Sequence, residues 1–261
     1  MMSIKTIPLA DYPIVNASLP QVVDTVLNRL RSGHSGGDPG STTPETYQTG
    51  FAHITTINPL IMMGCESKLA LKKWILSSQL IVPDGVGIQW AIQSRLGVRV
   101  SCITGIDLTM ELLQNGGFSC MMVGASPVNY DLAMSRVTHQ FPNTHFLTGF
   151  HGFYPDSEWG MIIRKIQRQR PDLLLVAMGF PRQEQFLNAV SQSVAFGTGI
   201  GVGGVIDVLS GQVNRAPGWV QHARLEWLYR ALRQPSRVRN WPVLAHFVRW
   251  VYQQPRTSLP H

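Results

Sequence analysis

Short apolar segments alternate along most of the chain with longer segments of helical periodicity. The apolar segments predict strands over 51–57, 80–82, 118–123, 144–147, 173–178 and 194–200. The periodic segments predict helices over 20–30, 69–76, 86–96, 108–114, 128–140, 157–169 and 183–191. Strands that are apolar throughout are typical of a parallel sheet with helices on both faces. The pattern therefore predicts an α/β fold.

Two segments depart from this alternation. Residues 32–50 are rich in Gly, Ser, Thr and Pro and show no periodicity, which predicts a flexible loop. From Arg215 onward the pattern is helical only, with breaks near Pro235 and Pro242. We therefore expect one domain over 1–214 and a helical appendage over 215–261.

The net charge of +7 lies entirely in this appendage, which holds eight arginines, no lysine and one acid, Glu226. Its arginines are interleaved with tryptophans, at Trp219, Trp227, Trp241 and Trp250. A neutral body with a basic, aromatic tail favours binding to phosphates, either of a ligand or of an anionic membrane surface. The alternative is an ordinary solvated helix that happens to use arginine.

Other features bound the compartment and the class of protein. Hydrophobic residues make up 44% of the chain and charged residues 14%, enough apolar material for a packed core. No apolar run is long enough to span a bilayer, and no signal peptide is evident. Three cysteines without metal-type spacing favour a reducing compartment. We expect a cytoplasmic protein that is peripheral to the inner membrane, with no nucleic-acid partner; a homo-oligomer stays open.

Three predicted strands end in polar or glycine-rich motifs, over 55–58, 83–87 and 179–184. In a parallel sheet these ends share one edge, where ligands bind. Asp84 is the carboxylate best suited to act as a general base, because Gly85 and Gly87 leave room for a ligand beside it. Alternatively, Asp84 caps the helix that follows.

Metal and nicotinamide chemistry find little support in the motifs. The chain contains neither Asp-x-Asp nor His-Glu-x-x-His, so no metal site is predicted. The turn over 199–204 has the glycines of a dinucleotide fingerprint but lacks its downstream acid, so it favours either backbone contact with a nucleotide or tight packing. Without a metal, a diphosphate would need arginines, and Arg230, Arg233 and Arg237 share helical spacing. They equally suit the polar stripe of a docked helix.

Seven motifs in register resemble the WecG/TagA/CpsF family of bacterial glycosyltransferases. They are Thr56-Ile57-Asn58, Asp84-Gly85-Val86-Gly87, Thr104-Gly105-Ile106-Asp107-Leu108, Gly179-Phe180-Pro181-Arg182-Gln183-Glu184, Gly201-Val202-Gly203-Gly204-Val205-Ile206-Asp207, Arg215-Ala216-Pro217 and Leu225-Glu226-Trp227-Leu228-Tyr229-Arg230. The likeness covers roughly residues 51–240.

The resemblance implies a Rossmann-like body and an inverting transferase that needs neither metal nor cofactor. It implies transfer from a UDP-sugar, of N-acetylmannosamine type or glucose, to a sugar on undecaprenyl diphosphate, in cell-surface polysaccharide synthesis. Asp84 would then activate the acceptor. The substrate-binding residues would be Thr56, Asn58, Gln183, Gly201, Gly203, Arg215, Arg230, Arg233 and Arg237.

One position departs from the family pattern. Where the family has an arginine before its Thr-Gly-x-Asp-Leu motif, this chain has Cys102, and Arg99 lies three residues earlier. Loss of a cation near a developing diphosphate charge slows such reactions. This departure supports an alternative hypothesis, a catalytically impaired sugar-nucleotide-binding protein that assists a polysaccharide assembly complex.

Overall fold

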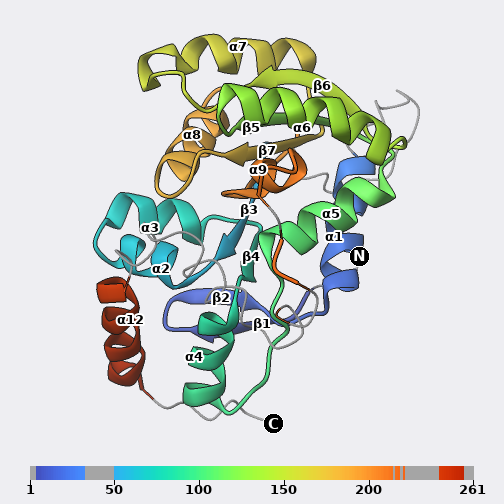
Figure 1. The fold of residues 1–261 in the computed structure, drawn as a ribbon. Coiled ribbons are helices and arrows are strands. Elements are labelled where there is room, and N and C mark those ends of the chain that lie inside the picture. Colours follow the sequence, from blue (N-terminus) through green and yellow to red (C-terminus); the bar gives the residue numbers. More distant parts are fainter. Residues whose placement is uncertain (1–3, 33–49, 214, 218–219, 221–240, 256–261) are drawn as a thin grey trace, which may run out of the picture. The chain divides into compact units, whose positions relative to one another are not determined.

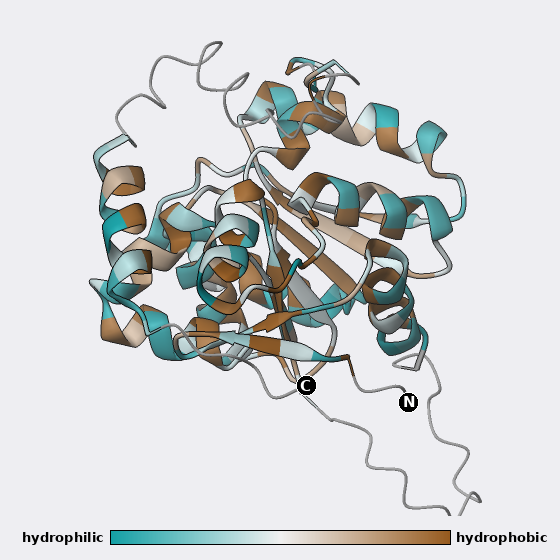
Figure 2. Ribbon diagram, turned by 90° about the horizontal axis from the view of Figure 1, so that it is seen from below, coloured by the Kyte–Doolittle hydropathy of each residue, from teal (hydrophilic) through white to brown (hydrophobic). Residues whose placement is uncertain are grey.

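The computed structural model describes residues 4–32, 50–213, 215–217, 220 and 241–255. Its eight strands form a mostly parallel sheet with helices around it (Figure 1), so the predicted α/β, Rossmann-like fold is confirmed. Hydrophobic residues are concentrated in the central strands, whereas the helices carry both hydrophobic and hydrophilic residues (Figure 2). Of the loop predicted over 32–50, residues 33–49 lie outside the described residues, and Ser32 belongs to a helix. The arginines Arg230, Arg233 and Arg237 also lie outside the described residues.

The described residues fall into two compact units. The first comprises residues up to Leu19, Thr55–Thr104 and the described residues from 215 onward. The second comprises Pro20–Ile54 and Gly105–Val213. Strand β3 (Ala52–Ile57), buried at every position, begins in the second unit and ends in the first. The boundary that the sequence predicts at Arg215 stays a prediction.

The first unit opens with a hairpin that the sequence pattern did not predict. Strands β1 (Thr6–Leu9) and β2 (Tyr12–Val15) pair antiparallel, and β2 runs parallel to β4 (Leu80–Pro83) with Ile14 opposite Ile81. Pro8 and Pro13 face each other across the hairpin. Because proline lacks the N–H that a ladder needs, two prolines in four-residue strands hide the strand signal.

A polar cluster joins this hairpin to helices α2 (Pro59–Glu66) and α3 (Leu69–Leu76), of which the sequence predicted only the second. The Tyr12 hydroxyl donates to Glu66 Oε1 over 2.8 Å, and Lys72 Nζ lies 2.9 Å from both Glu66 Oε1 and Asp11 Oδ2. Burial alone would lower the pKa of Lys72, but its hydrogen bonds to Asp11 and Glu66 raise it.

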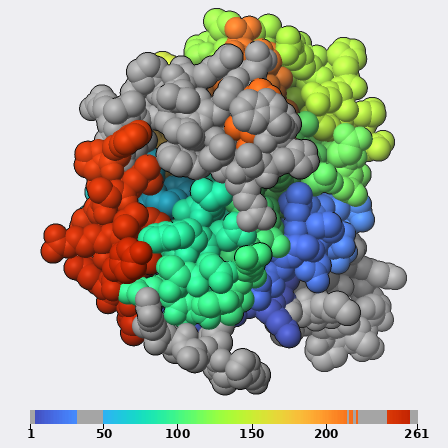
Figure 3. Space-filling view, turned by 60° about the horizontal axis from the view of Figure 1, so that its bottom comes forward, coloured from blue at the N-terminus to red at the C-terminus, as the bar shows by residue number. Residues whose placement is uncertain are grey.

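Helix α12 (Trp241–Gln253) contacts α2 and α4 (Val86–Leu96), and Figure 3 shows α12 and α4 side by side at the surface. Buried Arg95 of α4 donates through Nε to the Val251 carbonyl over 2.6 Å and through Nη2 to the Tyr252 carbonyl. Pro242 stands in the first turn of α12, where its missing N–H has no helical partner to lose. It therefore lies where a proline is tolerated in this helix.

The second unit contains four parallel strands in the order β8-β7-β5-β6. They are β5 (Ser119–Gly124), β6 (His145–Phe150), β7 (Leu173–Ala177) and β8 (Thr198–Gly201). Their helices are α1 (Leu19–Ser32), α5 (Gly105–Asn115), α6 (Pro127–Gln140), α7 (Trp159–Gln169), α8 (Arg182–Ser191) and α9 (Val205–Leu209).

This strand order places a switch point between β5 and β7. From β5 the chain crosses through α6 outward to β6, whereas from β7 it crosses through α8 in the opposite direction to β8. Since such crossovers are right-handed, α6 and α8 lie on opposite faces of the sheet. The crevice between the carboxyl ends of two such strands is the usual ligand site of open α/β sheets.

Candidate active site

In the first unit, Asp84 directly follows β4 and is half-buried. Its backbone N–H donates to the Ile57 carbonyl over 2.8 Å, which ties the end of β4 to the end of β3. The residue at the N-cap of α4 is Gly85, with a φ of 81°, and no side chain of that cap bonds the helix. The alternative in which Asp84 is the N-cap residue is therefore wrong.

Asn58 connects this carboxylate to the start of α2. Its Oδ1 accepts from the backbone N–H groups of Leu60 and Ile61, both over 3.1 Å, so Asn58 is the N-cap of α2. Since the oxygen must face these donors, Nδ2 points the other way and lies 3.4 Å from Asp84 Oδ2. The cap thus fixes a donor against the proposed base.

Helices α2 and α4 approach each other closely beside Asp84. A Cβ added at Gly87 would lie 2.5 Å from Pro59 Cγ and 3.8 Å from Phe247 Cε1 of α12. Gly87 therefore serves close packing between helices, and its part in access for a ligand stays a prediction. Thr56, in β3, is buried.

The segment that contains Cys102 runs beside the same strand end. The Ile103 N–H donates to the Pro83 carbonyl over 2.9 Å. Cys102 and Asp84 are therefore the sequence neighbours of two residues that are hydrogen-bonded to each other. Cys102 is half-buried and is not part of a disulfide. Arg99 is exposed, and Arg215 is half-buried outside regular secondary structure. The structure therefore gives a cysteine, not a cation, at this point of the chain.

The second unit has a cavity of about 680 Å³ at the switch point between β5 and β7. It is bounded by the loops that follow the four strands, namely 125–126, 152–155, 177–179 and 203–204, together with Arg182 and Asp207. Its volume suits a ligand of cofactor size. The cavity lies at the ends of four strands, including β5 and β6, whose ends the motif search passed over. Of the three predicted strand-end motifs, only 179–184 borders it.

Backbone hydrogen bonds hold three of these loops together. The Ala125 N–H donates to the Ala177 carbonyl over 3.0 Å, and the Gly152 N–H donates to the Ala125 carbonyl over 2.7 Å. Ala125 has a φ of 62°, a left-handed conformation. Ser126 then caps α6, its Oγ accepting from the Asn129 N–H over 3.2 Å. The partly positive start of α6 thus borders the cavity.

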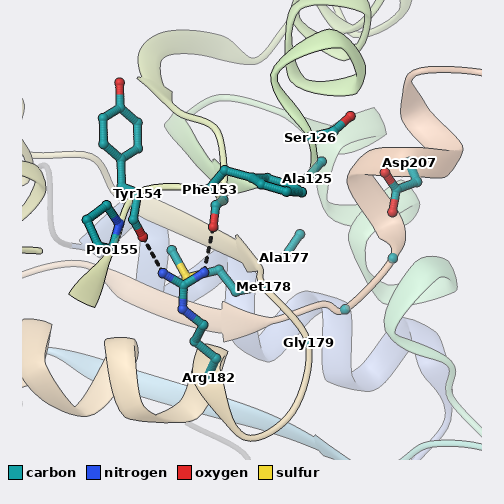
Figure 4. Close-up of a pocket in the computed structure, with 13 residues that line it drawn as sticks. Ala125, Ser126, Phe153, Tyr154, Pro155, Ala177, Met178, Gly179, Arg182 and Asp207 are labelled. Atoms are coloured by element: carbon teal, nitrogen blue, oxygen red, sulfur yellow. Dashed lines mark hydrogen bonds between the residues drawn. The ribbon is translucent and has the colours of Figure 1, made fainter. Parts of the chain in front are cut away.

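Two side chains give the cavity its chemical character. Asn129 Nδ2 donates to Asp207 Oδ1 over 2.7 Å, which fixes the carboxylate. Phe153 is 72% exposed, and its ring extends toward Ala125, with Asp207 on the far side from Tyr154 (Figure 4). A fixed carboxylate accepts hydrogen bonds from hydroxyls, and an exposed ring offers a stacking surface. Both residues were missed as site residues by sequence reasoning, although Asp207 stands in a recognised motif.

Arg182 is a clamp on one wall of the cavity. Its guanidinium donates through Nη1 to the Gly152 carbonyl over 2.6 Å, through Nη2 to the Tyr154 carbonyl, and through Nε to Asp156 Oδ1 over 3.0 Å. Figure 4 shows two of these bonds holding the loop that carries Phe153. This arginine therefore orders a loop between β6 and α7.

Gln183, expected to line the substrate site, is buried and bonded at both ends of its amide. Oε1 accepts from the Gly203 N–H over 3.0 Å, and Nε2 donates to Glu184 Oε1 over 2.8 Å. Gly203, with a φ of 55°, borders the cavity, whereas Gly201 is buried in β8 against Gln183. Burial raises the pKa of Glu184 to about 7, against the lowering effect of the Gln183 hydrogen bond.

Among the residues that the structure describes, no three His, Cys, Asp or Glu side chains are grouped closely enough to hold a metal ion. None of the helices in the described part of the chain is both long and apolar enough to cross a membrane.

Together, the parallel sheet and the cavity at its switch point define a Rossmann-like α/β protein with a cavity at the carboxyl edge of its strands. The profile of the glycosyl transferase WecG/TagA/CpsF family matches residues 7–260, and the chain belongs to this family of glycosyltransferases. The resemblance seen in the motifs is thereby confirmed.

Two relatives narrow the comparison. The chain is 31% identical over 189 residues to the N-acetylglucosaminyldiphosphoundecaprenol N-acetyl-beta-D-mannosaminyltransferase of Bacillus subtilis, covering 71% of this chain and 73% of that protein. It is 31% identical over 219 residues to the protein of the same name from Bacillus spizizenii, covering 82% and 84%.

Proposed function

We propose that this glycosyltransferase moves a sugar of N-acetylmannosamine type from UDP to a sugar on a polyprenyl diphosphate, in the synthesis of a cell-surface polymer. The observation that carries the proposal is the Asp84 carboxylate, held by Asn58 at the end of β4. It stands in a chain whose relatives are named N-acetylglucosaminyldiphosphoundecaprenol N-acetyl-beta-D-mannosaminyltransferases. Within the same proposal, the transferred sugar can instead be glucose, from a UDP-glucose donor.

Asp84 is the proposed general base of an inverting reaction. It takes the proton of the acceptor hydroxyl as that oxygen attacks C1 of the donor sugar, and the bond from C1 to the UDP oxygen breaks on the opposite face. The electron pair of that bond leaves with UDP, and the configuration at C1 inverts. No metal or cofactor is needed if arginines stabilise the diphosphate, a role we assign to Arg215, Arg230, Arg233 and Arg237.

The cavity in the second unit is the proposed site of the UDP moiety. The Asp207 carboxylate, oriented by Asn129, suits the ribose hydroxyls, and the exposed Phe153 ring suits the base. The start of α6 at Ser126 favours an anionic group. The basic tail would bring the enzyme to the cytoplasmic face of an anionic membrane.

Release of UDP tests this proposal. UDP should form from UDP-N-acetylmannosamine only when a lipid-linked N-acetylglucosamine diphosphate is present. The rate of this reaction should be unchanged by EDTA. Asp84→Asn should lower kcat by about a thousandfold, the usual order for loss of a general base. Asp131→Asn, at an exposed position of α6, is the matched control and should keep full activity. Unchanged turnover in Asp84→Asn would refute the role of the base.

Cys102 favours one competing function, a sugar-nucleotide-binding protein with little turnover. It precedes Ile103, whose N–H donates to the Pro83 carbonyl next to Asp84, and the family pattern has an arginine at this position of the chain. This alternative predicts that UDP binds without acceptor-dependent release, and that Cys102→Arg restores turnover. Full acceptor-dependent release of UDP by the unmodified chain would exclude this alternative function.

A further inference from the structure

Two successive residues at the start of α8 bond different walls of the same cavity, and the third bonds the second. Arg182 holds the loop at Gly152 and Tyr154, while Gln183 holds Gly203 across the cavity. Glu184 contacts neither wall and instead accepts a hydrogen bond from the Gln183 amide. One turn of helix therefore links two walls that lie far apart in the sequence.

Gly203 and Glu184 together decide which way the Gln183 amide faces. Gly203 offers an N–H, so the amide presents its oxygen there and its nitrogen to the other side. Glu184 Oε1 is the acceptor for that nitrogen. An apolar side chain at position 184 would leave the buried nitrogen unpaired, so the amide would lose one of the two hydrogen bonds that hold it.

Close packing makes this arrangement sensitive to small changes. A Cβ added at Gly201 would lie 2.7 Å from Gln183 Nε2 and 3.2 Å from its Cδ. The Gln183 amide is therefore pressed against the backbone of β8, with no room for a methyl group. A shift of the amide would move its oxygen away from the Gly203 N–H.

Glu184 also has an ordinary explanation, since an acid in the first turn of a helix is favoured by the helix dipole. An exposed carboxylate would serve that purpose without loss of hydration. Glu184 is instead only 4% exposed, and its Oε2 is buried without a hydrogen-bond partner among the described residues. Burying a carboxyl oxygen without a hydrogen-bond partner is unfavourable, and the helix dipole does not require it. This burial favours a role in which Glu184 holds a neighbouring group in place.

We propose that Glu184 is a positioning residue of the nucleotide cavity, which acts by holding the Gln183 amide so that Gln183 fixes the Gly203 wall. The inference rests on the proposed function in taking UDP as the ligand of this cavity. It assigns to Glu184 no contact with substrate.

Four variants test this inference through the dissociation constant for UDP, kcat and KM. Glu184→Leu removes the hydrogen-bond acceptor of the Gln183 amide, and Gly201→Ala displaces this amide from the other side. Each variant should raise the dissociation constant for UDP and the KM about tenfold, because the hydrogen bond from Gly203 to Gln183 is weakened. The kcat should change little. Glu184→Gln keeps an acceptor oxygen and should bind UDP within about threefold of the unmodified protein.

Gly199→Ala is the matched control for Gly201→Ala. Its added Cβ would meet Leu187 Cδ2 and Phe51 Cζ, both at 2.5 Å, so it crowds the same strand against apolar side chains. It should lower the melting temperature but leave the UDP dissociation constant unchanged. Amide exchange of Gly203, measured without ligand, should accelerate in Glu184→Leu and Gly201→Ala only.

Native UDP affinity together with native Gly203 exchange in Glu184→Leu would overturn the inference, as would a Glu184→Gln variant that is as defective as Glu184→Leu. If Glu184→Leu does not fold, Gly201→Ala decides by the same two measurements. Failure of the unmodified protein to bind UDP would instead refute the proposed ligand, and Gly203 exchange would still test the contact.

Discussion

The two units build their sites from different materials. In the first, the proposed chemistry depends on side chains at strand ends, where the Asp84 carboxylate faces the Asn58 amide. In the second, the cavity is bounded largely by backbone and by loops, and its polar side chains mostly hold those loops in place. A single substitution should therefore remove chemistry in the first unit, whereas it should loosen binding in the second.

The largest expected effect on stability comes from the buried carboxyl group of Glu184, in the second unit. Glu184 is buried, and its pKa is raised to about 7 from an ordinary 4.5, so the folded protein binds its proton more tightly than the unfolded chain does. The resulting stability is fully present below pH 4.5 and is lost as pH rises through 7. The free energy of unfolding should fall by about 3 kcal/mol across this range because of Glu184 alone.

Urea unfolding at a series of pH values measures this effect. Glu184→Gln cannot titrate at this position, so its stability should change less over the same range, whereas Asp131→Asn should follow the unmodified protein. Parallel curves for Glu184→Gln and the unmodified protein would mean that the carboxyl is not held neutral by burial.

Asn58 allows the first unit to be tested without disturbing its helix. Asn58→Asp keeps an N-cap oxygen for α2 but replaces the donor near Asp84 Oδ2 with a second carboxylate. Two carboxylates at this distance disfavour ionisation of each other, so kcat at neutral pH should fall by up to about a hundredfold. The acid limb of the pH–rate profile should move to higher pH.

Asn58→Leu separates capping from catalysis. It removes both the cap oxygen and the donor, and should lower the free energy of unfolding by about 1 kcal/mol in addition to its loss of kcat. If Asn58→Asp retained full kcat with an unshifted profile, the contact between Asn58 and Asp84 would have no part in the reaction.

In the second unit, Asp207→Asn should weaken binding rather than chemistry. The variant keeps the shape of the side chain but loses the charge that Asn129 orients, so the dissociation constant for UDP should rise about tenfold. Calorimetric titration measures this, with Asp131→Asn as the control. A loss confined to kcat would place Asp207 in the chemical step and so break the contrast between the two units.

The contrast also explains what the sequence could and could not predict. Asp84 and Asn58 follow apolar strands, and that local signal led to both of them. Phe153 and Ser126 belong to loops whose closeness depends on strand order, which no local pattern encodes. Gln183 was expected in the substrate site from resemblance, yet its amide is bonded to Gly203 and Glu184 within the protein. The β1–β2 hairpin was missed because prolines obscure its strands.

The smallest effect tests whether the first unit's chemistry depends on local contacts or on the stability of the unit as a whole. Lys72→Met removes the ammonium that pairs with Asp11 and Glu66 on the hairpin side of α2 and α3. Because Lys72 is only 17% exposed, the loss should lower the free energy of unfolding by about 1 kcal/mol. Lys73→Met, at the exposed neighbouring position, should change stability little.

Since neither lysine contacts Asp84 or Asn58 in any described hydrogen bond or ion pair, kcat should stay unchanged in both variants, as measured by UDP release. A fall in kcat for Lys72→Met alone would mean that the geometry of Asp84 depends on the packing of the whole unit.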